Sequence, residues 1–333
     1  MLESDCMKAV VLEKTCKADE LSVSEVPIPE IKEDWILVKV IGFGINRSEV
    51  ILRDYEADED YINLPVIPGI ECVGEVVNPS NTNFKKGDRV AALMGGMGRT
   101  FNGSYAEYCL LPVKNVFKID DNVFSHLSVE EIIAIPETFF TSYASLKTLQ
   151  LNEDDTLLIR GATSAAGLSS IQLAKASGCK VIATSRNSSK FDLLKNYGAD
   201  YTLTDDGILN DKIKEIFPEG VSKILELIGP ATLEDSMKCL KKYGICCNTG
   251  VLGGVEYIKD FDPIKLIPND CYLTSFFSNY PSQEFMDNLF GFIIDRNIKP
   301  KIGKIFNSLD EIKDAHKLME SNKANGKIIF RLV

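Results

Sequence analysis

The sequence is poor in the residues that bind transition metals. It has only two histidines, His126 and His316, and its nine cysteines include no Cys-x-x-Cys pair. A zinc ribbon and a dithiol redox motif both need such spacing, so neither class of site is expected. The scattered cysteines are typical of buried thiols that act as small hydrophobic side chains, and they fit a reducing compartment.

Long apolar runs and excess positive charge are also missing. No stretch is long enough to cross a bilayer as a helix, and 48 acidic residues outnumber 37 basic ones to give a net charge of −11. This balance argues against nucleic acid and against an anionic membrane as the main partner. Residues 1–6 look like a short acidic leader without the layout of a signal peptide, so we expect a cytoplasmic protein.

The sequence does contain the pattern of a supersecondary unit between residues 156 and 190. An apolar strand, Thr156–Arg160, leads into a turn of small residues, 161–167. A helix and a second apolar strand, Val181–Thr184, follow. This order predicts a βαβ unit whose turn binds the pyrophosphate of a nicotinamide dinucleotide at the helix N-terminus.

Most glycines of the Gly-x-Gly-x-x-Gly fingerprint are missing from this turn. Counted back from Gly167, the other two positions hold Ala162 and Ser164. Small residues between two strands still let a phosphate approach the backbone. The alternative is an ordinary α/β turn whose small residues serve only packing. The predicted cofactor contacts in the turn are Ser164, Ala165, Ala166 and Gly167.

Acidic residues are missing where an NAD site would need one. Such a site usually has Asp or Glu at the end of the second strand, where it holds the ribose 2′-hydroxyl. Between Cys179 and Phe191 there is none, and Ser185, Arg186 and Lys190 are found instead. Cations with neighbouring hydroxyls suit a 2′-phosphate, so we predict NADPH as the cofactor. The alternative, a solvated basic helix start, is disfavoured by the helix dipole.

The pattern of elements changes near residue 130. The first 130 residues consist of short apolar or alternating runs separated by turn residues, with one helix over Asn46–Arg53. From Ser128 to residue 248 helices and strands alternate, with IPETFFT (135–141) as a link, which indicates a parallel sheet covered on both faces. The last segment is too short for its own domain, and we expect it to pack against the N-terminal barrel.

Several motifs in a fixed order resemble one known family. They are PGIECVGEV, KKGDRVAAL, GSYAEY, IPETFFTSYASL, the nucleotide turn and AHKLMESNKANGKIIF. With them the chain after Met7 is similar to the medium-chain dehydrogenase/reductase superfamily, specifically its zinc-free quinone oxidoreductase-like branch. The resemblance implies an α/β protein with a GroES-like catalytic domain (residues 1–132 and 279–333). It also implies a Rossmann NADP-binding domain with a doubly wound parallel sheet (residues 133–278).

The resemblance also indicates whether this chain binds a metal ion and which class of acceptor it reduces. Zinc enzymes of the superfamily carry ligands at three positions that here hold Asn46, Ile70 and Glu137. Asparagine is a poor zinc ligand, isoleucine cannot be one, and Glu137 alone cannot hold the ion, so we expect no metal site. Without that Lewis acid the expected acceptor is already activated, as a quinone or an α,β-unsaturated carbonyl is.

Three candidate catalytic residues follow from the same resemblance. Asn46 corresponds to an asparagine near the nicotinamide, whose amide could donate to a substrate carbonyl; the alternative is a helix cap. Tyr55 corresponds to a tyrosine above the substrate pocket, or else belongs to a solvated acidic loop. Thr141 corresponds to a threonine that faces the nicotinamide, with helix packing as the alternative.

Further residues are assigned in the same way. Gly250 and Val251 are expected to line the nicotinamide side through backbone groups, and Lys327 to approach a cofactor phosphate unless it is a surface lysine. Glu71 and Glu137 are interpreted as structural hydrogen-bonding partners. Phe276 and Phe277 are interpreted as core rather than as walls of the substrate pocket.

The stretch Cys271–Phe277 is interpreted as an apolar edge strand, which is normally covered by pairing. In relatives such a strand extends the sheet across a homodimer, and we expect a homodimer here. The favoured activity is NADPH:quinone or enone reduction on a small molecule. Two alternatives stay open: an enoyl-thioester reductase, which would need a long acyl channel, and an NADPH-binding sensor or interaction protein with little catalysis.

Overall fold

The computed structural model describes residues 5–333, so most of the predicted leader lies outside the described residues. The chain divides into two compact units: unit 1, formed by Met1–Glu137 and Ser278–Val333, and unit 2, formed by Thr138–Phe277. The predicted boundary after residue 132 falls earlier, within helix α3 (Val129–Ile133), which belongs to unit 1. Unit 2 is therefore one continuous segment, whereas unit 1 joins residues from both ends of the chain.

Unit 1 is organised around strand β3 (Trp35–Ile45), whose sequence WILVKVIGFGI is apolar enough to be buried along most of its length. β3 pairs antiparallel with β15, so Ile328 lies opposite Ile45 although the two are far apart in sequence. The sheet order is β14 (Ile302–Phe306), β15 (Lys327–Arg331), β3, β4 (Glu71–Asn78), β5 (Arg89–Leu93) and β7 (Val116–Lys118), with β6 (Tyr108–Pro112) also paired to β3. β1 (Cys6–Val10) and β2 (Val23–Pro27) form a separate antiparallel pair.

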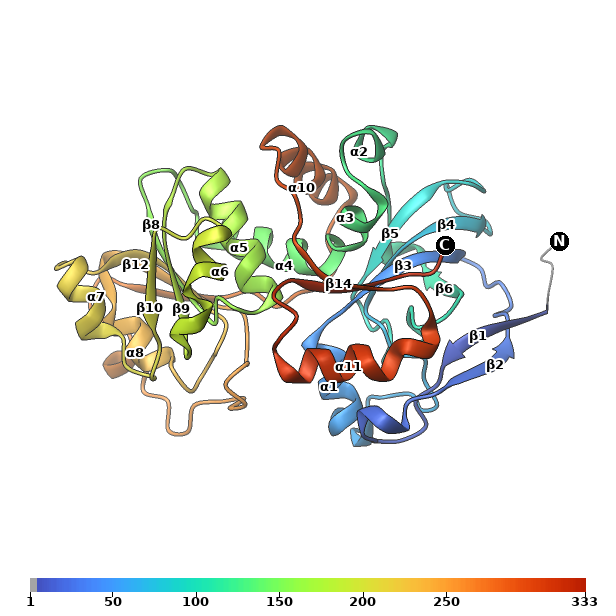
Figure 1. Ribbon diagram of the computed structural model, residues 1–333, viewed down its shortest axis with the longest axis horizontal. Helices are drawn as coiled ribbons and strands as arrows, with labels where there is room; N and C mark the ends of the chain where they lie inside the picture. Colours follow the sequence, from blue (N-terminus) through green and yellow to red (C-terminus); the bar gives the residue numbers. More distant parts are fainter. Residues whose placement is uncertain (1–4) are drawn as a thin grey trace. The chain divides into compact units, whose positions relative to one another are not determined.

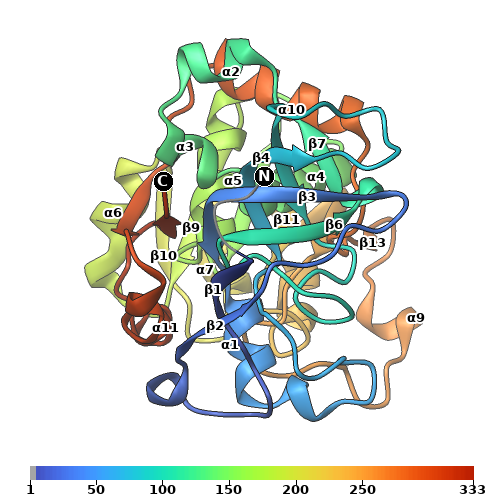
Figure 2. The ribbon, with the colours of Figure 1, turned by 90° about the vertical axis from the view of Figure 1, so that its right-hand side faces the viewer.

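The core of unit 1 includes a stack of aromatic rings contributed by both ends of the chain. Phe330 stacks on Phe43 with 4.8 Å between ring centroids and on Phe306 with 5.3 Å. Helices α10 and α2 lie side by side, as Figures 1 and 2 both show. The helices of this unit are α1 (Arg47–Asp54), α2 (Asp121–His126), α3, α10 (Gln283–Asp295) and α11 (Ile312–Ser321), with 3-10 turns at Ala18–Glu20, Glu56–Asp58, Val113–Asn115 and Leu309–Glu311.

Unit 2 is a doubly wound parallel sheet, as predicted. Its order is β10 (Tyr201–Thr204), β9 (Lys180–Ser185), β8 (Thr156–Arg160), β11 (Val221–Glu226), β12 (Leu240–Asn248) and β13 (Tyr272–Ser275). The chain winds outward from β8 in both directions, which is the strand order of dinucleotide-binding folds. Such folds bind ligands outside the carboxyl ends of the strands, next to the central strand where the winding reverses.

Helices cover both faces of this sheet (Figure 1). Leu209 and Ile213 of the α7 region and Leu233 and Met237 of α8 pack with apolar residues of β8, β9, β11 and β12 on one face. The helices of unit 2 are α4 (Pro136–Thr148, which begins in unit 1), α5 (Ala165–Ala176), α6 (Phe191–Asn196), α7 (Asn210–Ile216), α8 (Leu233–Lys238) and α9 (Pro263–Leu266), with a 3-10 turn at Ser188–Lys190. No helix among residues 5–333 is long and apolar enough to span a bilayer.

The prediction that IPETFFT (135–141) is a link between helices is wrong, because α4 already begins at Pro136. Proline is well tolerated at the first position of a helix, where its missing N–H has no intrahelical partner in any case. Thr141 therefore lies within a helix rather than at the start of one.

Candidate functional site

The turn after β8 has the geometry of a phosphate-binding turn. Gly161 has a φ of +77°, a conformation that favours glycine, and α5 begins at Ala165. A Cβ on Gly167 would lie 2.6 Å from three backbone atoms of Ala162, so only glycine allows the helix to approach the turn this closely. Within residues 5–333 the N–H groups of Ala165 and Ala166 have no acceptor. These two donors at a helix N-terminus fit a pyrophosphate.

Ser164 has a structural role that was not anticipated. Its hydroxyl oxygen accepts a hydrogen bond from Gly167 N at 3.1 Å and donates one to Gly161 O at 2.8 Å. Ser164 is therefore the N-cap of α5. Because its hydroxyl takes the N–H of Gly167, the donors that the turn offers to a ligand are those of Ala165 and Ala166.

The end of β9 presents the predicted basic residues. Ser185 closes a small turn by bonding to both backbone groups of Asn187, at 3.1 Å from its N and 3.0 Å from its O. Arg186 is exposed, and no carboxylate among the described residues pairs with it. Lys190 ends the following 3-10 turn. The structure thus brings Ser185, Arg186 and Lys190 together on one turn.

A buried ion pair beside this turn escaped the sequence analysis. Arg160, at the end of β8, donates from Nε and Nη2 to the two oxygens of Asp205, both at 2.9 Å, and from Nη1 to Asp235 at 2.9 Å. Asp205 N bonds to Ser185 O at 2.9 Å, so this carboxylate lies next to the predicted 2′-phosphate site. Burial raises the pKa of Asp205, but its hydrogen bonds and ion pair with Arg160 outweigh this and lower the pKa. Asp205 is thereby held ionised, and its charge is balanced by the Arg160 guanidinium.

Glu226, at the end of β11, bonds to the loops that follow β11 and β12. Its side-chain Oε1 accepts from Ile228 N at 2.8 Å and from Gly229 N at 3.0 Å after β11, and its backbone carbonyl accepts from Thr249 N at 2.9 Å after β12. A Cβ on Gly250 would lie 2.3 Å from Leu227 O, so the predicted residue Gly250 lies tightly against the neighbouring strand end. Val251, the next predicted residue, is 43% exposed.

Two serines of α4 connect the phosphate turn with this loop. Ser142 Oγ donates to Ala166 O at 2.9 Å, while Ser145 Oγ bonds to Thr141 O at 2.7 Å and to Thr249 Oγ1 at 2.9 Å. The turn of α4 that carries Thr141 therefore lies beside Thr249. The sequence analysis missed both serines, although their three-residue spacing on one helix face was visible.

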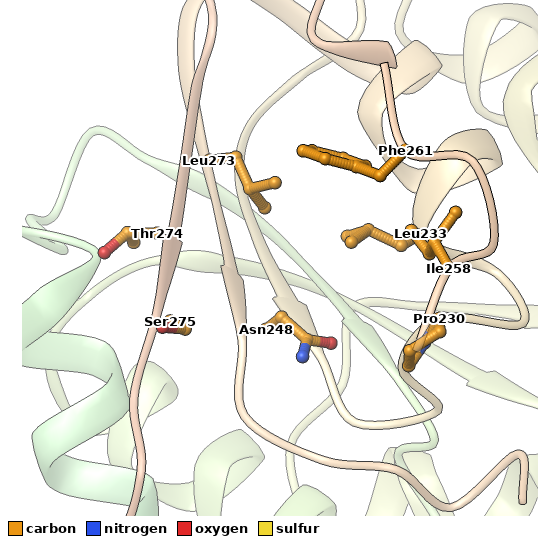
Figure 3. A pocket seen from close by; sticks show the side chains of 8 residues that line it. All are labelled: Pro230, Leu233, Asn248, Ile258, Phe261, Leu273, Thr274 and Ser275. Carbon is orange, nitrogen blue, oxygen red and sulfur yellow. The ribbon is translucent and has the colours of Figure 1, made fainter. Parts of the chain in front are cut away.

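A pocket of about 550 Å³ with apolar and polar walls lies at the carboxyl ends of β12 and β13 (Figure 3). The amide oxygen of Asn248 is buried there and has no hydrogen-bond partner within residues 5–333. None of the residues predicted for cofactor binding or catalysis lines it. Its lining is Pro230, Leu233, Asn248, Ile258, Phe261, Leu273, Thr274 and Ser275.

Unit 1 contains a buried polar cluster around Asn46. Asn46 Nδ2 donates to Glu71 Oε1 at 2.9 Å and to Glu49 Oε1 at 3.4 Å, and Asn46 Oδ1 accepts from Lys327 Nζ at 2.5 Å. Lys327 Nζ also pairs with Glu71 Oε1 at 2.6 Å. Both amide hydrogens of Asn46 thus have carboxylate acceptors. Donation to a substrate carbonyl would require the amide to leave one of them.

Glu49 joins this cluster through the start of α1. Its Oε2 accepts from Asn46 N at 2.8 Å and its Oε1 from Ile70 N at 3.2 Å. Burial and the charge of Glu71 raise the pKa of Glu49, the ammonium of Lys327 and the backbone donors lower it, and the balance lies at about 7. Glu71, predicted as a structural partner, is fully buried and also accepts from Glu137 N at 2.7 Å.

The remaining predicted residues are placed as follows. The surface alternative for Lys327 is wrong, because the residue is 4% exposed, and a contact with a cofactor phosphate would require its ammonium to leave Asn46 and Glu71. Tyr55 lies at the end of α1 and is 52% exposed.

Phe276 packs edge-on against Phe140, whereas Phe277 is 82% exposed, so its assignment to the core is wrong. Among residues 5–333 no three His, Cys, Asp or Glu side chains are grouped so as to hold a metal ion.

Two family models match the chain. The model described as "Alcohol dehydrogenase GroES-like domain" matches residues 32–121, and that described as "Zinc-binding dehydrogenase" matches residues 165–293. The first lies in unit 1, and most of the second lies in unit 2.

Individual relatives cover nearly the whole chain. The quinone oxidoreductase of Homo sapiens is 27% identical over 93% of this chain and 92% of its own length. An alcohol dehydrogenase of Geobacillus stearothermophilus is 30% identical over 74% of this chain and 78% of its own length. Among solved structures, mycobacterial Rv1454c complexed with NADPH superposes with a TM-score of 0.81 at 24% identity, covering 98% of this chain and 99% of that one.

Proposed function

Because this chain belongs to the medium-chain dehydrogenase/reductase superfamily, in its quinone oxidoreductase-like branch, we propose that it is an NADPH-dependent, zinc-independent reductase of quinones or α,β-unsaturated carbonyls. The family makes it an oxidoreductase, and its doubly wound unit implies a nicotinamide cofactor. The choice of NADPH, the acceptor and the independence from zinc are the proposal.

The turn at the end of β9 carries the choice of NADPH. Arg186 is an exposed guanidinium without a carboxylate partner among the described residues, and Ser185 and Lys190 flank it. Asp205, whose backbone N–H bonds to Ser185 O, is bound at both carboxylate oxygens by Arg160, so its charge is already balanced by a buried cation. The 2′-phosphate of NADPH would therefore lie near a cation, whereas the ribose 2′-hydroxyl of NADH would lack the carboxylate that an NAD site usually provides.

The cofactor fits the residues of unit 2. Ala165 and Ala166 supply N–H donors, Gly167 lets the helix approach, and Val251 is 43% exposed beside the closely packed Gly250. When bound, the nicotinamide supplies a hydride equivalent to an acceptor. Ser145 fixes the turn of α4 that carries Thr141 against Thr249, so Thr141 stays a candidate to contact the nicotinamide.

The acceptor class follows from the side chains of unit 1. Asn46, Ile70 and Glu137 are not a zinc-binding set, so a substrate carbonyl would not be polarised by that metal. An acceptor that stabilises its own negative charge, such as a quinone or an enone, does not need this polarisation. Tyr55, half exposed at the end of α1, stays the candidate for donating a proton through its hydroxyl.

The proposal also includes a homodimer and a cytoplasmic location. β13 is an edge strand whose Tyr272 is 55% exposed, and Phe277 beyond it is 82% exposed, which suits pairing with the same strand of a partner. All nine cysteines are free thiols, which supports a reducing compartment.

The test is NADPH oxidation followed at its absorbance maximum with a panel of quinones, enones and saturated ketones. We expect turnover with the first two classes, none with saturated ketones, and no loss after dialysis against a chelator. Activity that disappears with chelator and returns with zinc would contradict the proposal. NADPH binding without turnover of any acceptor would favour the sensor alternative instead.

The cofactor choice has its own test. Arg186→Ala is expected to raise the KM for NADPH tenfold or more, an effect of about 1.4 kcal/mol or more, while leaving the KM for NADH unchanged. Lys195→Ala, which removes an exposed cation from the next helix, α6, is the matched control. Equal effects of Arg186→Ala on both cofactors would refute the assignment.

A further inference from the structure

The ammonium of Lys327 occupies an unusual position in unit 1. It lies 2.5 Å from Asn46 Oδ1 and 2.6 Å from Glu71 Oε1, and these groups come from β15, from the residue before α1 and from β4. Glu71 is fully buried and Lys327 nearly so. A cation is therefore held between two oxygens that are themselves fixed by other hydrogen bonds.

The backbone makes room for this cation at one glycine. A Cβ on Gly44 would lie 2.3 Å from Lys327 Cε, 2.4 Å from Glu71 Oε1 and 2.8 Å from Lys327 Nζ. Any other residue at position 44 of β3 would displace the ion pair. Gly44 thus serves the Lys327–Glu71 contact, since its φ does not lie in the left-handed region.

The position of Nζ is the one that a metal ion would need. Divalent ions bind carboxylate and amide oxygens at about 2.0–2.4 Å, and an ion bound to both Asn46 Oδ1 and Glu71 Oε1 would overlap the ammonium. Glu49, whose Oε1 lies 3.4 Å from Asn46 Nδ2, adds a second carboxylate to the same cluster. The cluster thus comprises two carboxylates and an amide: the ammonium contacts Glu71 and Asn46 directly and interacts with Glu49 electrostatically.

The electrostatics require a cation in this place. Buried carboxylates without a counter-charge are strongly unfavourable. The other cation nearby, Arg99, is already engaged by both oxygens of Glu56, at 2.8 and 2.6 Å. Lys327 is the group that balances Glu71.

We propose that Lys327 is the resident cation of this cluster, and that its ammonium excludes a divalent metal from the oxygens of Asn46, Glu49 and Glu71. Removing the ammonium converts these three side chains into a site for a hard divalent ion such as Mn²⁺, since carboxylate and amide oxygens suit that class. The proposal disagrees with the zinc that the matched family description names. It deepens the proposed independence from zinc and does not rest on the acceptor or on NADPH.

The test compares wild type with Lys327→Met in the full chain, without cofactor or acceptor. Bound Mn²⁺ is counted by the loss of the free-ion signal in electron paramagnetic resonance, and the thermal midpoint is measured with and without Mn²⁺. Wild type is expected to bind none at this site and to keep its midpoint. Lys327→Met is expected to melt several degrees lower, to bind one Mn²⁺ per chain and to regain part of the loss.

Two further variants separate this idea from general destabilisation. Lys327→Arg keeps a cation and is expected to bind no Mn²⁺, while Lys327→Met/Glu71→Gln loses the key ligand and is expected not to respond. If Lys327→Met does not fold, Lys327→Gln, which removes the charge but keeps an N–H donor for Glu71, is measured instead. A folded Lys327→Met variant that does not bind Mn²⁺, or stoichiometric metal at this site in wild type, overturns the proposal. Because NADPH oxidation is not measured, failure here leaves the proposed cofactor and acceptor untouched.

Discussion

Arg160 and Asp205 form a two-pronged ion pair across two strand ends of unit 2, with Nε–Oδ2 and Nη2–Oδ1 distances of 2.9 Å each. The side chain of Arg160 is fully buried and that of Asp205 is 3% exposed. One residue further, Gly161 opens the phosphate turn, and Asp205 is bonded through its backbone to Ser185. The pair therefore ties the phosphate turn to the strand end that carries the predicted 2′-phosphate contacts.

Breaking this pair is expected to destabilise the protein strongly. Arg160→Leu leaves Asp205 as a buried carboxylate without its partner, and removing one member of such a pair costs about 3–5 kcal/mol. Urea unfolding of the variant measures the loss. Lys238→Ala, which removes one end of the exposed pair with Glu234, is the control and should change stability by less than about 1 kcal/mol. Similar small effects of both changes would show that the buried pair is not needed.

The glycine that closes the phosphate turn provides a second prediction. Gly167→Ala places a Cβ 2.6 Å from the backbone of Ala162, so we expect a loss of about 1–3 kcal/mol and weakened dinucleotide binding. Gly291→Ala is the matched control, because a Cβ in the middle of α10 meets nothing within 4 Å. That change should stabilise by about 0.5–1 kcal/mol. Calorimetric titration with NADPH and denaturant unfolding distinguish the two, and unchanged NADPH affinity in Gly167→Ala would contradict the assignment of the turn.

The pH dependence of stability is expected to report Glu49. Its pKa rises on folding from 4.5 to about 7, chiefly because of burial. The protonated form is therefore favoured in the folded state, and its contribution to stability is fully present below about pH 4.5. That contribution declines as the pH rises towards 7 and is constant above. Urea unfolding of wild type and Glu49→Gln across this range measures it, and a difference between the two that does not vary with pH would disprove the shift.

The edge strand provides a fourth prediction. Tyr272→Glu puts a charge on the exposed side of β13, where 55% of the residue is accessible, and such a charge opposes pairing of two edges. Light scattering should find twice the 36.9 kDa chain mass for wild type and one chain for the variant. Ile208→Glu, at a residue that is 66% exposed before α7, should remain dimeric. A monomeric wild type would contradict the predicted dimer.

Features that depend on neighbouring residues were predictable from the sequence. The βαβ unit, the alternation in unit 2 and the basic turn at Ser185–Lys190 all arise from local patterns, and the parallel, doubly wound sheet followed from that alternation. The start of α4 was missed because the whole segment IPETFFT (135–141) was interpreted as a link, although Pro136 is well suited to the first position of a helix. The N-cap role of Ser164 was missed for a related reason, since a fingerprint position was compared with glycine alone.

Contacts between distant residues were not predictable in the same way. Arg160 and Asp205 are 45 positions apart, and Lys327 lies 281 positions from Asn46. Each of these side chains, taken alone, is an ordinary polar residue beside an apolar strand. A usable signal was Gly44, because a glycine inside an otherwise apolar strand indicates a close approach. That the side chain of Lys327 is an approaching group follows only from the pairing of β15 with β3.

The pairing of β3 with β15 has a consequence for the order of folding during synthesis. Unit 2 is continuous from Thr138 to Phe277 and all of it has been made before β14 and β15 emerge from the ribosome. Unit 1 cannot complete its sheet, its aromatic stack or the Lys327–Glu71 pair until residues 302–331 are available. Domains fold as units during synthesis, and long-range strand pairing is slow. Unit 2 is thus expected to fold first, while β3 keeps its Gly42–Ile45 edge unpaired until β15 is available.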